Sequence, residues 1–448
     1  MCWKPEYILL IVSSTLIDYY AGIKMAQEKN KANRKPFLLL SLFTNLGLLF
    51  AFKYFNFFSE STRALFDYIN IFYNMPHFNV LLPVGISFYT FQTLSYSIDV
   101  YRGEKTAEKH LGIFALYVAF FPQLVAGPIE RSTRLLPQLR KENTFDFVRV
   151  KEGLLLMLWG FFKKIVIADR LAVVVNTVYN DVGNYQGFEL IIASIFFAFQ
   201  IYCDFSGYSD IAIGGAKVMG YDLMKNFNRP YFSKSIVEFW RRWHISLGSW
   251  FRDYVYFPLG GSRVSMIKKY SNLLIVFLVS GLWHGANWTF VIWGALHGSY
   301  QIIGYILTPI RNKIKNLLQI NSNGKYYKLF QVIFTFILVD FAWIFFRANS
   351  LNDALYIIKN LFVFNLNSLT DKSMLNLGLH EKDIYLSFLL IILLLIVQLK
   401  QRNTTIIKWI LRQNLAIRWA IYLLSIYSII IFGHYASGKE SQFIYFQF

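Results

Sequence analysis

The sequence contains little charge and almost no cysteine. Charged residues make up 16% of the 448 residues, whereas soluble globular chains carry about a quarter. The two cysteines, Cys2 and Cys203, are too few for a disulfide framework or for a zinc site of four cysteines. A soluble protein of this length would usually contain polar linkers between domains, but no such linker divides this chain. These absences argue against an ordinary soluble protein and exclude a disulfide-rich secreted one.

Several well-known catalytic and binding motifs are also missing. The chain has no G-x-S-x-G nucleophile elbow, no P-loop and no dinucleotide-binding fingerprint. His380 and Glu381 are not followed by a second histidine at the spacing of a zinc protease. His297 lies thirteen residues after His284 and is predicted to be on a different helical face. We therefore expect no metal site and no bound cofactor.

Long apolar runs dominate the sequence instead. Hydrophobic residues make up 55% of the chain and the mean hydropathy is +0.39. Runs of this kind predict an all-α, polytopic membrane protein with about 10–11 transmembrane or re-entrant helices. The candidate spans are residues 7–23, 37–57, 80–98, 111–125, 154–173, 188–205, 271–293, 295–307, 329–346, 384–397 and 417–434. The first run lacks a cleavage site, so we expect it to remain as a transmembrane helix.

The formal net charge of +19 invites a nucleic-acid interpretation, but the positions of the charges argue against it. The basic residues cluster between the apolar runs, for example at 24–35, 131–151, 311–315 and 400–412. Short basic loops are typical of the cytoplasmic side of membrane proteins. We expect the lipid bilayer as a partner and no nucleic acid.

Two places could interrupt the predicted helices. Residues 82–85 contain Pro83 and Gly85, and three glycines follow a later run, at Gly207, Gly214 and Gly215. Such breaks favour re-entrant segments around a buried site, because irregular backbone inside a membrane must face protein or water. Proline and glycine are also simply commoner in membrane helices, so both interpretations stay open.

The sharpest candidate site is the segment 280–288. It places His284 in the middle of an apolar run, flanked by Trp283, Asn287 and Trp288. An ionisable group inside a bilayer is costly and usually faces a partner or a cavity. A neutral imidazole is a good general base because its ordinary pKa is near 6.5. The alternative is a histidine that only packs against a neighbouring helix.

A second candidate lies in residues 238–257. Read as one helix, it carries Trp240 and His244 on an apolar stripe, with Arg241 beside the stripe. The pattern is typical of a helix lying in the membrane interface. His244 within that stripe marks it as a candidate site residue.

A polar cluster occupies residues 200–210. Asp204 and Asp210 need partners in apolar surroundings, and Arg229, Arg241 or Arg242 could supply them. We interpret the cluster, with Tyr208, as a structural ion pair that fixes a re-entrant loop.

Taken together, these segments resemble the membrane-bound O-acyltransferase (MBOAT) family, in its alginate O-acetyltransferase branch. The similarity covers nearly the whole chain, and the order and spacing of the motifs make it specific. The matching stretches are residues 82–92, 121–129, 204–210, 239–247, 256–261, 281–288 and 443–448. Family members usually begin with a further apolar segment, so the helix count could be short by one.

The resemblance implies a single MBOAT transmembrane domain of residues 1–448 with its catalytic core at about 80–300. It implies a ring of helices around a central tunnel, with His284 as the catalytic residue and His244 as a second histidine of the site. Trp283, Asn287, Trp288, Asp204, Tyr208, Trp240 and Arg241 are the candidate substrate-binding or tunnel residues.

The activity implied by the resemblance is O-acyl transfer in the bacterial inner membrane. An acetyl group would come from a cytoplasmic thioester such as acetyl-CoA. It would pass to a periplasmic SGNH-type O-acetyltransferase partner for modification of alginate, another exopolysaccharide or peptidoglycan. Three alternatives stay open: D-alanyl transfer to teichoic acid, a proton-coupled transporter or flippase, and a non-catalytic scaffold.

Overall fold

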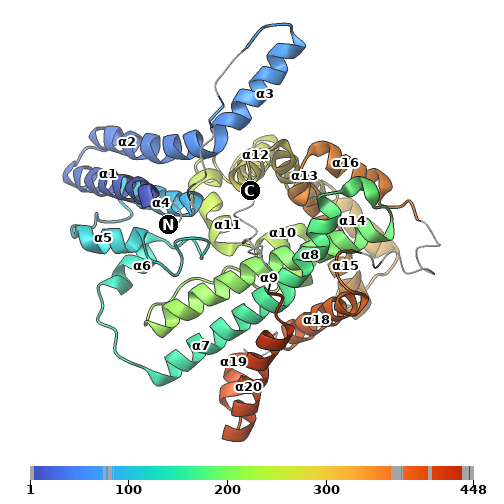
Figure 1. Ribbon diagram of the computed structural model, residues 1–448. Helices are drawn as coiled ribbons and strands as arrows, with labels where there is room; N and C mark the ends of the chain where they lie inside the picture. Colours follow the sequence, from blue (N-terminus) through green and yellow to red (C-terminus); the bar gives the residue numbers. More distant parts are fainter. Residues whose placement is uncertain are drawn as a thin grey trace. The chain divides into compact units, whose positions relative to one another are not determined.

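The structure is a computed structural model that describes residues 5–73, 77–78, 83, 85–364, 375, 377–401, 406–435 and 443. All regular secondary structure in these residues is helical, which confirms the predicted all-α class (Figure 1). The chain packs as two compact units. The first contains Met1–Asp146, Met219–Met224 and Gly285–Asn287, and the second contains Phe147–Val218, Lys225–His284 and Trp288–Phe448. The single domain expected from the resemblance stays a prediction.

The first unit is built around α1, α2 and α4. Its elements are η1 (Pro5–Tyr7), α1 (Ile8–Gln27), α2 (Lys31–Leu49), η2 (Phe50–Tyr54), α3 (Phe55–Tyr68), α4 (Ile86–Arg102), α5 (Leu111–Val118) and α6 (Ser132–Leu139). The Asp18 carboxylate on α1 accepts hydrogen bonds from Ser41 Oγ and Asn45 Nδ2 on α2. Because hydrocarbon offers no partners to a carboxyl group, such contacts hold the helices together.

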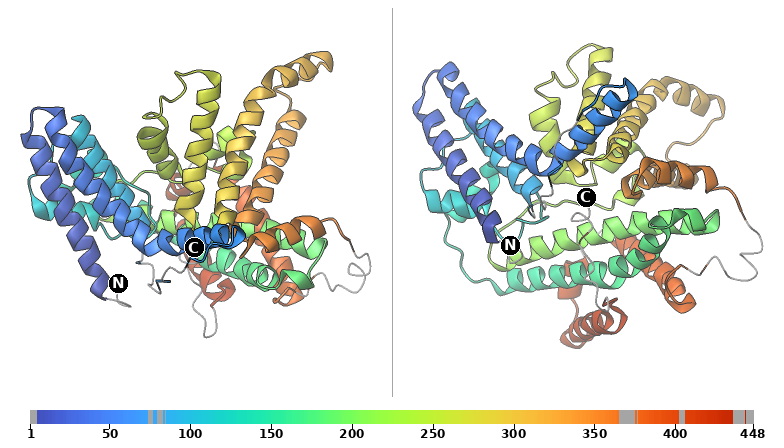
Figure 2. Two further views of the ribbon diagram at one scale, coloured as in Figure 1. Left: turned by 90° about the horizontal axis from the view of Figure 1, so that it is seen from above. Right: turned by 45° about the horizontal axis from the view of Figure 1, so that its top comes forward.

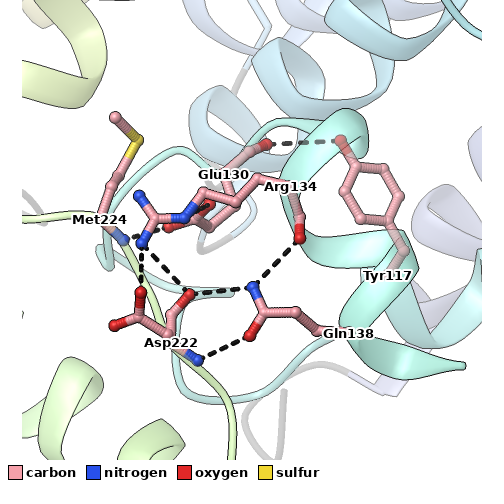
Figure 3. A network of polar contacts seen from close by, with 6 residues as sticks. All are labelled: Tyr117, Glu130, Arg134, Gln138, Asp222 and Met224. Atoms are coloured by element: carbon pink, nitrogen blue, oxygen red, sulfur yellow. Dashed lines mark hydrogen bonds and ion pairs between the residues drawn. The ribbon is translucent and has the colours of Figure 1, made fainter. Parts of the chain in front are cut away.

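A polar clamp in the same unit fixes the segment that follows α9 (Figure 3). Buried Glu130 accepts a hydrogen bond from the backbone N–H of Met224, and Arg134 pairs with Asp222 at 2.8 Å. Gln138 donates to the Asp222 carbonyl oxygen at 3.1 Å and accepts from its N–H at 2.8 Å. Burial raises the pKa of Glu130 to about 7. The clamp therefore joins α6 to residues 222–224 through both side chains and backbone.

The second unit contains the remaining helices. Its elements are α7 (Phe147–Phe161), the π-helix η3 (Phe162–Ala168), α8 (Asp169–Tyr179), η4 (Val182–Asn184), α9 (Phe188–Val218), η5 (Pro230–Phe232), α10 (Ile236–Trp240), α11 (Ile245–Phe251), the π-helix η6 (Arg252–Tyr256), α12 (Met266–His284), α13 (Trp288–Ile306), α14 (Thr308–Leu317), α15 (Lys325–Arg347), α16 (Leu351–Asn360), α18 (Glu381–Lys400), α19 (Ile406–Leu411) and α20 (Leu415–Phe432).

Helices α7 and α9 lie side by side and touch through glycine (Figure 2). A Cβ on Gly207 would lie 2.8 Å from the carbonyl oxygen of Gly160, and a Cβ on Gly160 would lie 2.7 Å from that of Gly207. Gly153 and Gly214 form a second pair of this kind. Small residues are the usual means of close helix approach in membranes. Helix α9 runs unbroken through Gly207, Gly214 and Gly215, so the predicted break and re-entrant loop at these glycines are wrong.

Seven helices of the described chain are long and apolar enough to span a membrane, and α13 with α14, bent by 51°, would make an eighth. The seven are Ile8–Gln27, Lys31–Tyr68, Phe188–Val218, Met266–His284, Lys325–Arg347, Glu381–Lys400 and Leu415–Phe432. The polytopic prediction is confirmed. The count is lower than expected partly because run 111–125 forms only the eight-residue α5, and because run 154–173 contains the four charged residues Lys163, Lys164, Asp169 and Arg170. The ring around a tunnel stays a prediction.

Candidate active site

His284 is the last residue of α12, where the chain turns into α13. The two helices pack with their backbones in contact, because a Cβ on Gly281 would meet the carbonyl oxygen of Phe290 and one on Gly294 would meet that of Phe277. The prediction of one span over residues 271–293 is therefore wrong. A histidine at a helix end is held by the turn and by the neighbouring helix together.

His244 lies in a break between α10 and α11, not inside one helix. Its φ of 43° is left-handed, a conformation that costs an L-residue other than glycine about 1–2 kcal/mol. The backbone N–H of Asn228 donates to the Arg242 carbonyl oxygen, and the N–H of Ile245 donates to that of Asn226, both at 2.9 Å. These hydrogen bonds to residues 226 and 228 stabilise the turn in place of hydrogen bonds within a helix. The predicted continuous helix over residues 238–257 is wrong for this reason.

The fold brings the two histidines together. Their ring centroids are 6.4 Å apart, and the residues are only 1% and 4% exposed for His244 and His284. Trp283 contacts both rings, with centroids 4.7 Å from His284 and 5.9 Å from His244. Phe205 on α9 lies 4.6 Å from His244, and Trp293 on α13 lies 5.1 Å from His284. The pair is thus surrounded by aromatic rings from α9, α12 and α13.

Burial also determines the charge of His244. It lowers the pKa of this imidazole to about 3, so the ring is neutral at ordinary pH. A neutral imidazole can accept a proton at one nitrogen and donate from the other. The arrangement suits proton transfer in a water-poor setting, whereas a permanently protonated His244 is disfavoured.

The other candidate residues have different surroundings. Trp240 lies near Trp293, with ring centroids 5.6 Å apart, while Arg241 is exposed in the turn. Tyr208 packs on Phe443, the only described residue of the C-terminal motif, at 5.1 Å.

One expectation for the 280–288 motif is wrong, and the role of Asn287 stays a prediction. Trp288 begins α13 and is 54% exposed, so it does not share a helical face with His284. Asn287 belongs to the first compact unit, whereas His284 belongs to the second.

The carboxylates of α9 pair with two lysines that the sequence analysis did not propose. Lys163 contacts Asp210 at 2.7 Å, and Lys164 contacts Asp204 at 2.8 Å. Lys164 also contacts Asp169 at 2.7 Å. The expected structural ion pairing is present. Its partners come from the π-helix η3, which sequence spacing alone did not indicate.

A third buried histidine was missed. Trp240 Nε1 donates to Nδ1 of His297 at 3.2 Å, and the His297 ring lies 5.1 Å from that of Trp293. The spacing of four residues between Trp293 and His297 on one helix could have indicated this contact. Among the described residues, no three His, Cys, Asp or Glu side chains gather as a metal site would require.

Comparison with known proteins places this chain in a family. A family model described as MBOAT, membrane-bound O-acyltransferase family, matches residues 110–348. The chain is 38% identical over 395 residues to the "Probable alginate O-acetylase AlgI" of Pseudomonas aeruginosa, which covers 87% of this chain and 72% of that protein. It is 32% identical over 494 residues to the peptidoglycan O-acetyltransferase of Helicobacter pylori, which covers 100% of this chain and 89% of that protein.

A more distant relative is named for transfer of D-alanine and not of acetate. The teichoic acid D-alanyltransferase of Bacillus subtilis is 29% identical over 240 residues, covering 50% of this chain and 58% of that protein. The family match includes His244 and His284 together with α9, α12 and α13. The chain belongs to the membrane-bound O-acyltransferase family and is a multi-pass membrane O-acyltransferase.

Proposed function

We propose that this enzyme takes acetyl groups from a thioester donor on the cytoplasmic side, with acetyl-CoA as the expected donor, for O-acetylation of an extracytoplasmic polysaccharide. Relatives named for alginate and peptidoglycan O-acetylation match 87% and 100% of the chain, whereas the D-alanyltransferase matches 50%. The setting would be the bacterial inner membrane. The final acceptor would be alginate, another exopolysaccharide or peptidoglycan, reached through a periplasmic SGNH-type O-acetyltransferase partner.

His284 would act as the general base. Its imidazole takes the proton of an acceptor hydroxyl while the oxygen attacks the thioester carbonyl carbon. The carbon–sulfur bond then breaks, and the leaving thiolate takes the proton back from the imidazolium. General-base catalysis of this kind is typically worth about 10²–10⁴-fold in rate.

The observation that carries the proposal is the buried histidine pair. The two imidazoles are 6.4 Å apart and buried among aromatic rings, with His284 at the end of the membrane-length helix α12. Burying an imidazole in a membrane protein costs free energy unless the ring has polar partners, and such residues often mark functional sites. Water exclusion by the surrounding rings would also protect the acyl group from hydrolysis.

The test compares His284→Ala with His380→Ala in cells in which this protein alone supports O-acetylation of the envelope polymer. His380 is exposed at the N-terminus of α18 and provides a matched histidine control. We expect His284→Ala to abolish release of acetate by mild base from the envelope polymer, while the protein still inserts in the membrane. A normal O-acetyl level in that variant would contradict catalysis and favour a scaffold. Release of D-alanine in place of acetate would favour teichoic acid as the acceptor.

A further inference from the structure

We propose that Asn226 is a positioning residue that holds His244 with its hydrogen on Nδ1 and its lone pair on Nε2. The proposal rests on the proposed role of His244 in acyl transfer. Asn226 lies in the segment between α9 and η5, outside the histidine motifs. Asn226 and His244 are each 1% exposed.

The orientation of the Asn226 amide is fixed by a neighbour that can only donate. Asn226 Oδ1 lies 3.3 Å from the backbone nitrogen of Ser246 and 2.9 Å from Ser246 Oγ. A backbone N–H has no lone pair, so the atom facing it must be the amide oxygen. The amide nitrogen then points to Ser209 Oγ, an acceptor at 3.4 Å. Contacts on both sides of the amide agree.

This orientation determines the tautomer of His244. Nδ1 of His244 lies 3.1 Å from the same Asn226 oxygen. Since that oxygen can only accept, Nδ1 carries a hydrogen. Burial keeps the ring neutral by lowering the pKa of His244 to about 3, and a neutral ring has only one N–H. The lone pair is therefore on Nε2.

The backbone of Asn226 supports the same arrangement. Its carbonyl oxygen accepts the N–H of Ile245 at 2.9 Å, directly after His244 in the chain. One residue thus binds the ring of His244 through its side chain and the backbone beside it through its main chain. Such partners are what a left-handed histidine needs in order to stay in place.

The tautomer restricts what His244 can do in the reaction. With its lone pair on Nε2, it can accept a hydrogen bond or proton from the acceptor hydroxyl or from His284. It cannot at the same time donate from Nε2 to an oxyanion. The expected part of His244 is therefore that of an acceptor working beside His284.

The activity test uses two substitutions that differ in one respect. Asn226→Asp keeps an acceptor oxygen and adds a negative charge, which raises the pKa of His244. We expect this variant to retain activity with the acidic limb of its rate–pH profile moved to higher pH. Asn226→Leu removes the acceptor, and we expect the rate per folded enzyme to fall about 100-fold, within the range of one acid–base group. Asn349→Leu is the control, because Asn349 contacts Arg347, Asn180 and the Tyr179 carbonyl oxygen and neither histidine, and this variant should stay near the wild-type rate.

A spectroscopic measurement separates this proposal from the proposed function. Nitrogen NMR of isotopically labelled histidine in lipid reports which ring nitrogen carries hydrogen, and His244→Gln identifies the His244 signal. A protonated Nδ1 in the wild type and an altered signal in Asn226→Leu are expected. A hydrogen on Nε2 overturns the proposal even if His244→Ala is inactive. Full activity of His244→Ala overturns the catalytic role of His244 while leaving the tautomer in place.

A second, independent inference concerns α14. None of its ten residues is buried, and α14 bends by 51° away from α13. Ile310, Ile314 and Leu317 fall on one face of the helix, each about half exposed or more. An isolated helix of this length without packing is marginal in water. In the described part of the chain, nothing buries this apolar face.

The charges around that face indicate what would cover it. Arg311 and Lys313 flank the apolar stripe, with Lys315 behind it. The sequence contains no aspartate or glutamate between Asp253 and Asp340. An apolar face bordered by basic residues is typical of helices lying in the plane of an anionic membrane surface. We infer that α14 lies in the lipid interface and binds anionic phospholipid headgroups.

The test uses the whole protein in lipid nanodiscs. A fluorophore on Ile314→Cys should be quenched by lipids with a nitroxide at the top of the acyl chain, and one on Asn312→Cys, on the opposite face, should not. Replacing Arg311, Lys313 and Lys315 by glutamine should reduce the phosphatidylglycerol retained around the protein. The control makes the same charge change at Lys24, Lys29 and Lys31. A water-exposed probe at Ile314, or cross-linking of Ile314→Cys between two copies, would overturn the inference.

Discussion

Two buried polar clusters lie against α9, and they are built in opposite ways. Lys163 and Lys164 of η3 pair with Asp210 and Asp204 on α9, so each charge has an opposite charge within 2.8 Å. Phe205, between these two carboxylates in the sequence, instead contacts the ring of His244. The first cluster is ionic, and the second consists of a neutral imidazole among aromatic rings.

This difference shows that ion pairs and neutral imidazoles serve different purposes in a buried site. Paired charges in a poorly solvated place are held by their partners, and losing one partner is expensive. A neutral imidazole can accept a proton at one ring nitrogen and release one from the other, so the ring is charged only transiently. The ionic cluster is therefore suited to holding α7, η3 and α9 together, and the histidine cluster to chemistry.

The largest expected effect comes from breaking the ionic cluster. Lys164→Met removes a lysine that pairs with both Asp204 and Asp169. Leaving a partly buried charge without its partner typically costs about 3–5 kcal/mol. We expect lower thermal stability in detergent but an unchanged rate per folded enzyme. Adding Asp204→Asn should recover part of the stability, and a rate that falls without loss of stability would contradict the division of roles.

The next effect is on activity. His244→Ala should lower the acyl-transfer rate by about 100-fold, which corresponds to about 2.7 kcal/mol in the barrier. His244→Gln should also change the pH dependence of stability. The folded pKa of His244, about 3, lies below its ordinary value of 6.5, so the wild type loses stability as the pH falls from 6.5 towards 3. Melting temperatures that fall equally in both proteins would argue that the ring is not buried and neutral.

A smaller effect is expected at His297, which is buried but lies outside the histidine pair. His297→Phe leaves Trp240 Nε1 without its acceptor. Loss of one such hydrogen bond costs about 1 kcal/mol. We expect a small decrease in stability with the acyl-transfer rate retained. A loss of rate as large as that of His284→Ala would enlarge the site to three histidines.

The smallest effect is expected at the Glu130 clamp. The folded pKa of Glu130, about 7, is above its ordinary value of 4.5, so the folded state keeps a proton that the unfolded state loses. Stability should therefore decrease between pH 4.5 and 7 by an amount that Glu130→Gln removes. Arg134 and Asp222 stay in place in this variant. Parallel melting curves for both proteins across that range would show that Arg134 already holds Glu130 ionised.

The sequence predicted the membrane class and the family, because apolar runs and the order of motifs are visible residue by residue, while the catalytic roles of His284 and His244 stay predictions. It could not predict the turn after His284, since hydropathy continues through residues 271–293 while the helix does not. The lysine partners of Asp204 and Asp210 come from a segment about forty residues earlier in the chain, and such pairing depends on how α7 and α9 pack. Asn226 and His297 became recognisable only through their contacts.

The left-handed backbone of His244 has a practical consequence for mutagenesis. Alanine at this position removes the ring but still pays the free-energy cost of a left-handed backbone. Glycine removes the ring and that cost together. Comparing the two variants thus separates the chemistry of the imidazole from energy stored in the main chain. If the glycine variant is more stable than the alanine variant but equally inactive, the left-handed backbone lowers the stability of the enzyme and serves to orient the His244 ring.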